Sequence, residues 1–207
     1  MTSAGVPGWH GALRPVRAHP GWIQNSVLSP RLVPANPGVK PTIVLVHGAF
    51  ADNSSWGAVV PQLQGLGYTV DVPPNPLRGV SYDSAYLSDF LSTISGPVVL
   101  VGHSYGGFII TNVGASDPEV KALVYVDSYL PAAGETLNYL NSVVKGTCIT
   151  PKMLNAVPYP GSTSGNEDLY VKPSAFPGCF VNGVPHAQAA VLAPSNSRWQ
   201  NSRRPRS

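Results

Sequence analysis

The sequence predicts an α/β fold, in which helices flank a mostly parallel sheet. Between residues 41 and 131, short apolar runs alternate with segments of helical periodicity, a pattern typical of parallel strands joined by helices. The 207 residues are 43% hydrophobic and 11% charged, which suffices to bury one core. The 21 glycines and 22 prolines stay below the roughly 25–30% that marks disordered chains.

The first elements are a strand, a helix and a second strand. Residues 42–48, TIVLVHG, are apolar at successive positions, as in a strand buried on both faces. Residues 52–55 carry side chains that cap helices, and the apolar positions up to Leu63 have helical spacing. Residues 68–72 predict the second strand.

The alternation continues after a loop at residues 73–79. Helical spacing covers residues 81–95, and PVVLVG at residues 97–102 predicts another buried strand. A helix is expected from Tyr105 to near Asp117, followed by a strand at residues 120–126.

Beyond Pro131 the pattern changes to a helix at 135–144, a stretch rich in Pro and Gly, and a short helix at 186–192. We interpret this region as a cap lying over the sheet rather than as more sheet. The expected organisation is an irregular Pro-rich arm (1–40), a core (41–131), a cap (132–192) and an irregular basic tail (193–207).

The net charge of +3 is unevenly distributed. The basic excess lies in the two ends of the chain, whereas residues 41–197 carry more acidic than basic residues. Nucleic-acid binding usually shows as a basic patch on a recognisable module, so we expect no nucleic-acid partner. No run reaches the roughly 18 apolar residues of a membrane span, and residues 1–40 hold no apolar core of a signal peptide. We therefore expect a cytoplasmic protein without a membrane partner.

The two cysteines, Cys148 and Cys179, match neither a zinc site nor a redox motif. We expect them to fill space, and a disulfide in an exported protein is the alternative. No cluster has the spacing of metal ligands, and no Gly-rich loop fits a dinucleotide or phosphate. The sequence thus implies no cofactor.

The segment from Gly102 to Gly106, GHSYG, matches the pattern G-x-S-x-G. The pattern alone is weak evidence, but here it stands between an apolar strand and an amphipathic helix, the setting of a nucleophile elbow. In that setting Ser104 lies on a sharp, strained turn that exposes its hydroxyl. Ser104 is therefore the candidate catalytic nucleophile.

Acyl transfer also needs hydrogen-bond donors for the developing oxyanion. The backbone N–H of Tyr105 is one candidate, and the second is Ala49 in the loop after the first strand. Phe50 is expected to form a wall of the substrate pocket. His103 is also expected to belong to the substrate pocket, because it directly precedes Ser104. Its side chain is expected to point away from the substrate face.

At this point the chain resembles the α/β-hydrolase family, in particular the small esterase- and lipase-like branch with the plant methylesterases and hydroxynitrile lyases. The resemblance depends on VLVHGAFADNSSW, PPNPLRG, VVLVGHSYGG and LVYVDSYLP in this order. It implies an α/β-hydrolase fold and hydrolysis of an ester through a serine, an acid and a histidine.

In that family the acid and the histidine follow the cap, in the order serine, acid, histidine. Here the tail shows no strand pattern and ends in an abrupt run of arginines. We therefore expect a C-terminally truncated chain, with a partial cap and the last core strands missing.

Residues within the chain could replace the missing groups. Asp127, after the strand beside the nucleophile strand, is the candidate catalytic acid, and the alternative is a capping carboxylate. His47 and His103 are expected to be structural. His186 is the remaining candidate base, although a helix terminus explains it equally well.

The expected function is hydrolysis of a small carboxylic ester or related acyl substrate, and this activity is impaired if the segment with the acid and the histidine is missing. Lyase or haloperoxidase chemistry on the same scaffold stays open. The alternative is a non-catalytic fragment that binds a partner or self-associates through the open sheet edge at residues 122–126.

Overall fold

The computed structural model describes residues 38–143, 148–160, 167–195 and 199–201. The chain divides into two units, Met1–Pro37 and Gly38–Ser207. The expected Pro-rich arm therefore lies almost entirely outside the described residues.

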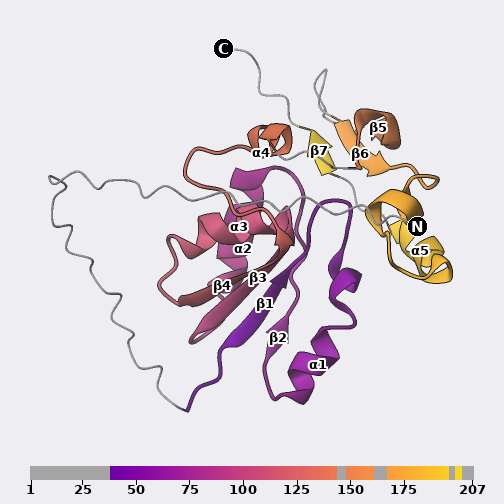
Figure 1. Ribbon diagram of the computed structural model, residues 1–207. Helices are drawn as coiled ribbons and strands as arrows, with labels where there is room; N and C mark the ends of the chain where they lie inside the picture. The colour runs from indigo at the N-terminus through magenta and orange to yellow at the C-terminus, as the bar shows by residue number, and fades with distance from the viewer. Residues whose placement is uncertain (1–37, 144–147, 161–166, 196–198, 202–207) are drawn as a thin grey trace, which may run out of the picture. The chain divides into compact units, whose positions relative to one another are not determined.

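A four-stranded parallel sheet forms the core of the second unit (Figure 1). Its strands, in spatial order, are β2 (Val70–Asp71), β1 (Thr42–Val46), β3 (Val98–Ser104) and β4 (Val120–Ser128). All three pairings are parallel. This confirms the predicted mostly parallel sheet.

Helices cover both faces of this sheet. On one face, α2 (Val80–Leu91) and α3 (Gly106–Gly114) pack against Val44 and Leu100. On the other face, the 3₁₀ helix η1 (Asn53–Trp56) and α1 (Val60–Gly65) pack against Leu45. β1 and β3 are buried on both sides, which explains why their sequences are continuously apolar.

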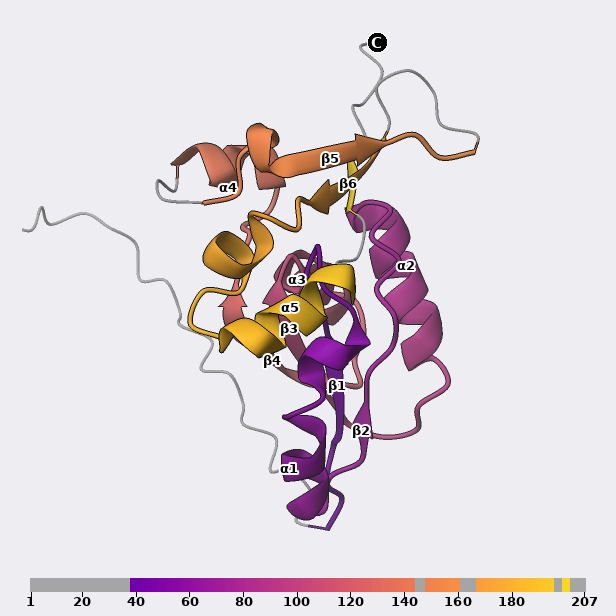
Figure 2. The ribbon, with the colours of Figure 1, turned by 90° about the vertical axis from the view of Figure 1, so that its right-hand side faces the viewer.

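The cap contains a second sheet, which the sequence did not predict. Its antiparallel strands are β5 (Leu154–Val157), β6 (Glu167–Val171) and β7 (Trp199–Asn201), in that order. Figure 2 shows β5 beside β6. The cap thus contains strands of its own, separate from the core sheet, and the expectation of a wholly irregular tail is wrong, because β7 pairs with β6.

The helical segments of the cap are short. They are α4 (Leu137–Val143), the 3₁₀ turn η2 (Pro151–Met153), the π-helical η3 (Phe176–Phe180), α5 (His186–Leu192) and the 3₁₀ turn η4 (Ala193–Ser195). Both predicted cap helices are present. Among the described residues, no helix is long and apolar enough to cross a membrane.

Two bonds connect parts of the chain that are distant in sequence. Cys148 and Cys179 form a disulfide, so the expectation that they merely fill space is wrong. The guanidinium of Arg78, in the loop after β2, donates to the buried carboxylate of Asp168 in β6 at 2.8 Å. This ion pair joins the cap to the core.

Candidate active site

Ser104 is the last residue of β3, and α3 begins two residues later. Its φ of 51° lies in the left-handed region, which residues other than glycine seldom adopt. The flanking glycines allow this turn to be tight. A Cβ on Gly102 would lie 2.8 Å from the backbone of Gly106, and a Cβ on Gly106 would lie 2.6 Å from the carbonyl oxygen of Val46. The strand, strained serine and helix have the geometry of a nucleophile elbow.

The end of β4 holds this turn from the other side. The hydroxyl of Ser128 donates to the carbonyl oxygen of Ser104 at 2.8 Å, and the N–H of Tyr129 donates to the same oxygen at 3.2 Å. Gly107, in the first turn of α3, packs against this segment. A Cβ added to Gly107 would collide with the Tyr129 carbonyl oxygen and the Ser128 hydroxyl. A side chain at position 107 is therefore excluded.

The loop after β1 contacts the nucleophile. A Cβ on Gly48 would lie 2.7 Å from the Cβ of Ser104 and 3.2 Å from its Oγ. This close approach brings the backbone of residues 48 and 49 beside the Ser104 hydroxyl.

Buried hydrogen bonds hold that loop in place. The N–H of Asn75 donates to Nε2 of His47 at 3.0 Å, so Nδ1 carries the ring proton and donates to the Gly48 carbonyl at 2.9 Å. The side-chain amide of Asn75 donates to the His47 carbonyl at 3.0 Å. Burial lowers the pKa of His47, which favours the neutral ring that this arrangement needs. His47 is therefore a structural residue, with both ring nitrogens engaged.

A cavity of about 370 Å³ opens at Ser104, and we call it the Ser104 cavity. Ala49 and Tyr105, the two expected oxyanion donors, line it together with Ser104. Phe50 forms part of its wall, and the cap supplies Ile149, Leu154, Leu169 and Phe180, among others. The structure thus brings four of the predicted site residues to one cavity.

A buried carboxylate beneath the elbow escaped the sequence analysis. Asp83, in the first turn of α2, is 1% exposed and accepts a hydrogen bond of 2.8 Å from the phenol of Tyr105. It also accepts the N–H groups of Arg78 and Gly79. Burial raises the pKa of Asp83, and the three hydrogen bonds oppose that rise. An acid in a first helical turn predicts capping, but no local pattern predicts its contact with Tyr105.

His103 and Asp127 lie outside the lining of the Ser104 cavity. The ring of His103 stands edge-on to Trp56, with 6.4 Å between centroids, on the sheet face opposite α2 and α3. Burial lowers the pKa of His103, and the charge of Asp127 partly opposes this. Asp127 is exposed and has a φ of 43°. It occupies a bulge in β4: His103 pairs with Val126 and Ser104 pairs with Ser128, so the register skips Asp127.

His186, the candidate base from the cap, is the exposed first residue of α5. None of the three histidines in the described ranges, His47, His103 and His186, lines the Ser104 cavity. The described residues also contain no group of three or more His, Cys, Asp or Glu side chains that could hold a metal ion.

Comparison with known proteins agrees with this geometry. The sequence profile of the alpha/beta hydrolase family matches residues 43–206. A carbendazim-hydrolysing esterase of Nocardioides sp. is 32% identical over 107 residues, which are 45% of this chain and 44% of the esterase. A pyrethroid hydrolase of Sphingobium wenxiniae is 34% identical over 108 residues, which are 45% of this chain and 38% of the hydrolase. The matched segment therefore spans less than half the length of these relatives.

Solved structures resemble the fold over a larger part of the chain. Tomato methylketone synthase I has a TM-score of 0.60 at 21% identity, covering 78% of this chain and 68% of the synthase. A pyrethroid hydrolase from Sphingobium faniae has a TM-score of 0.51 at 26% identity, covering 65% of this chain and 56% of that protein. With the family profile matched over most of its length, the chain belongs to the alpha/beta hydrolase family.

Proposed function

We propose that this chain supplies the nucleophile and the oxyanion-binding half of a serine hydrolase that cleaves small, largely apolar carboxylic esters. The observation that carries the proposal is that Ser104, on its strained turn, shares one cavity with Ala49 and Tyr105. The hydrolysis of carbendazim and of pyrethroids named for two relatives supports a small-molecule substrate.

In the proposed reaction, Oγ of Ser104 forms a bond to the ester carbonyl carbon while a base accepts the hydroxyl proton. The carbonyl π electrons move to the oxygen, and the N–H groups of Ala49 and Tyr105 donate to this oxyanion. The start of α3 adds a favourable helix dipole. When the tetrahedral intermediate collapses, the bond to the alcohol breaks, the alcohol takes up the proton, and water later releases the acid from the serine.

The described side chains of the Ser104 cavity include no histidine, so the proposal assigns no base. Without a base, turnover of an ester is expected to be slow. In well-studied enzymes, removal of one triad member leaves a rate only about 10³–10⁴-fold above that of the reaction in water. Covalent labelling detects a reactive serine even when turnover is slow, and is therefore the better test.

A fluorophosphonate probe is expected to add one phosphonyl group per protein, on the tryptic peptide that contains Ser104. Ser104→Ala should abolish the labelling, whereas Ser92→Ala, a matched change at an exposed serine after α2, should leave it unchanged. Intact-mass and peptide mass spectrometry measure both. A folded wild-type protein that takes up no probe would contradict the proposal.

A second candidate function is self-association. In the described sheet β4 pairs only with β3, and its side chains Val124 and Val126 are 43% and 41% exposed. An open apolar edge strand favours pairing with another chain.

If copies of this chain pair through β4, Val124→Lys should shift sedimentation velocity profiles toward the monomer at micromolar concentration. Val191→Lys, at a more exposed valine on α5, is the matched control and should not. A wild-type protein that sediments as a monomer would rule out this function.

A further inference from the structure

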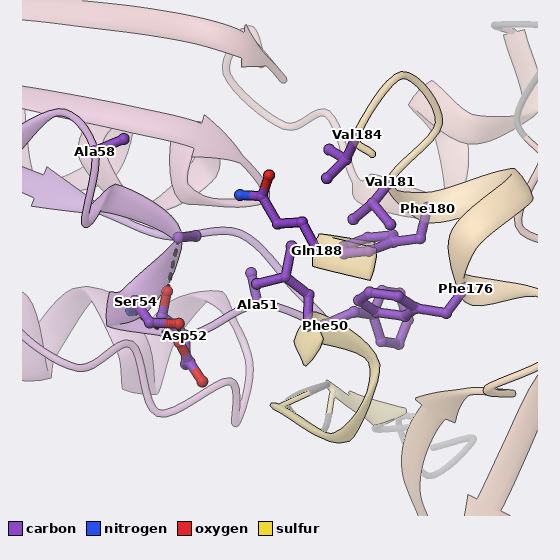
Figure 3. A pocket seen from close by; sticks show the side chains of 12 residues that line it. Phe50, Ala51, Asp52, Ser54, Ala58, Phe176, Phe180, Val181, Val184 and Gln188 are labelled. Atoms are coloured by element: carbon purple, nitrogen blue, oxygen red, sulfur yellow. Dashed lines mark hydrogen bonds between the residues drawn. The ribbon is translucent and has the colours of Figure 1, made fainter. Parts of the chain in front are cut away.

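A second cavity adjoins the Ser104 cavity and has no role in the proposed chemistry. It measures about 270 Å³ and lies between the segment of residues 50–58 and the cap elements η3 and α5. Figure 3 shows the rings of Phe50, Phe176 and Phe180 gathered on one side of this cavity. We call it the second cavity.

The two cavities share a wall made of two aromatic rings. Phe50 and Phe180 line both cavities, and their rings stand perpendicular with 5.8 Å between centroids. Phe50 follows the expected oxyanion donor Ala49 directly and has φ of 60°, so the turn that presents Ala49 also places this ring. Phe180 belongs to the cap, and its ring packs on the ring of Phe176 with 5.0 Å between the ring centroids. The two cavities therefore border each other at the rings of Phe50 and Phe180.

The lining of the second cavity is mostly apolar. Val181, Val184 and Leu192 complete the aromatic end, and in Figure 3 Asp52, Ser54 and the amide of Gln188 lie away from the rings. An apolar cavity of about 150 Å³ accommodates a benzene molecule in a well-studied case. The second cavity therefore has room for an aryl or branched alkyl group, with polar groups at its far end.

We infer that the second cavity is a binding subsite for an aryl or branched alkyl arm of the ester whose carbonyl is bound at Ser104. The inference rests on the proposed function, because the arm is defined by its attachment to the reacting carbonyl. Phe50 and Phe180 then determine specificity: they contact the substrate between its reacting centre and its arm.

Two fluorophosphonates test the subsite, one with a methyl group and one with a naphthylethyl arm on the same phosphorus. The wild-type protein should react with the arm-bearing probe about tenfold faster or more, because burial of the aryl group in the second cavity favours binding of that probe. Val184→Trp fills the second cavity and should reduce the ratio of the two labelling rates to about one. Val191→Trp, on α5 but outside the cavity lining, should retain the preference.

Ala51→Leu, at a half-buried lining residue next to Phe50, fills the second cavity from the core side and guards against a Val184→Trp protein that fails to fold. A preference that persists in both filling variants, or no preference in the wild type, would overturn the inference while the methyl probe still supports the proposed function. If neither probe labels Ser104 in a folded wild-type protein, the proposed function fails, and the inference that rests on it falls with it.

Discussion

Gly107→Ala is expected to destabilise the fold by about 3 kcal/mol or more, at the upper end of what overpacking a core costs. The added methyl group would occupy the position of the Tyr129 carbonyl oxygen and the Ser128 hydroxyl. Both neighbours belong to the segment that binds the carbonyl of Ser104. Displacing this segment removes its hydrogen bonds to the elbow, so labelling of Ser104 should fall together with stability. Urea unfolding followed by circular dichroism measures the first effect.

Gly114→Ala is the matched control on the same helix. The three atoms nearest to a Cβ at position 114 all belong to the side chain of Leu123, the closest at 2.7 Å, and a flexible side chain can move aside. The cost should stay within about 1 kcal/mol, because alanine also favours the helix over glycine. Equal losses of stability in the two variants would show that the backbone of Tyr129 does not restrict position 107.

Removing the disulfide is expected to cost about 3–4 kcal/mol, because the two cysteines close a loop with a sequence separation of 31 residues. The effect should concentrate in the cap. Ile149 follows one cysteine and Phe180 follows the other, and both side chains line the Ser104 cavity. The double variant Cys148→Ser, Cys179→Ser should therefore unfold at lower urea concentration than the oxidised wild type.

Reduction provides the control for this change. The wild-type protein in excess dithiothreitol should unfold at the same urea concentration as the double variant, since both lack the crosslink. An oxidised wild-type protein that unfolds no later than its reduced form would contradict the expected stabilisation.

The core and the centre of the candidate site could be predicted because their signals are local. A continuous run such as residues 42–48 indicates a strand buried on both faces, and the helical spacing at residues 81–95 indicates an amphipathic helix. Ser104 and Tyr105 are adjacent in sequence, and Ala49 lies in the turn that follows β1. For these residues, chain position and local conformation determine the placement.

The cap could not be predicted in the same way. β5, β6 and β7 are short, and β6 pairs with a strand from the tail, so no window of the sequence contains the pairing. The same holds for Asp168, whose ion pair with Arg78 spans 90 residues, and for Asp83 beneath Tyr105.

The sequence by itself therefore determined the parallel sheet, the elbow with its serine and the loop that faces it, because hydrophobic periodicity and glycine spacing act over a few residues. Only the tertiary structure decided the pairing of the cysteines, the sheet of the cap and the aromatic wall between the two cavities. Those contacts join distant segments: apolar burial stabilises them against the entropic cost of closing long loops, and neither effect produces a periodic pattern in the sequence.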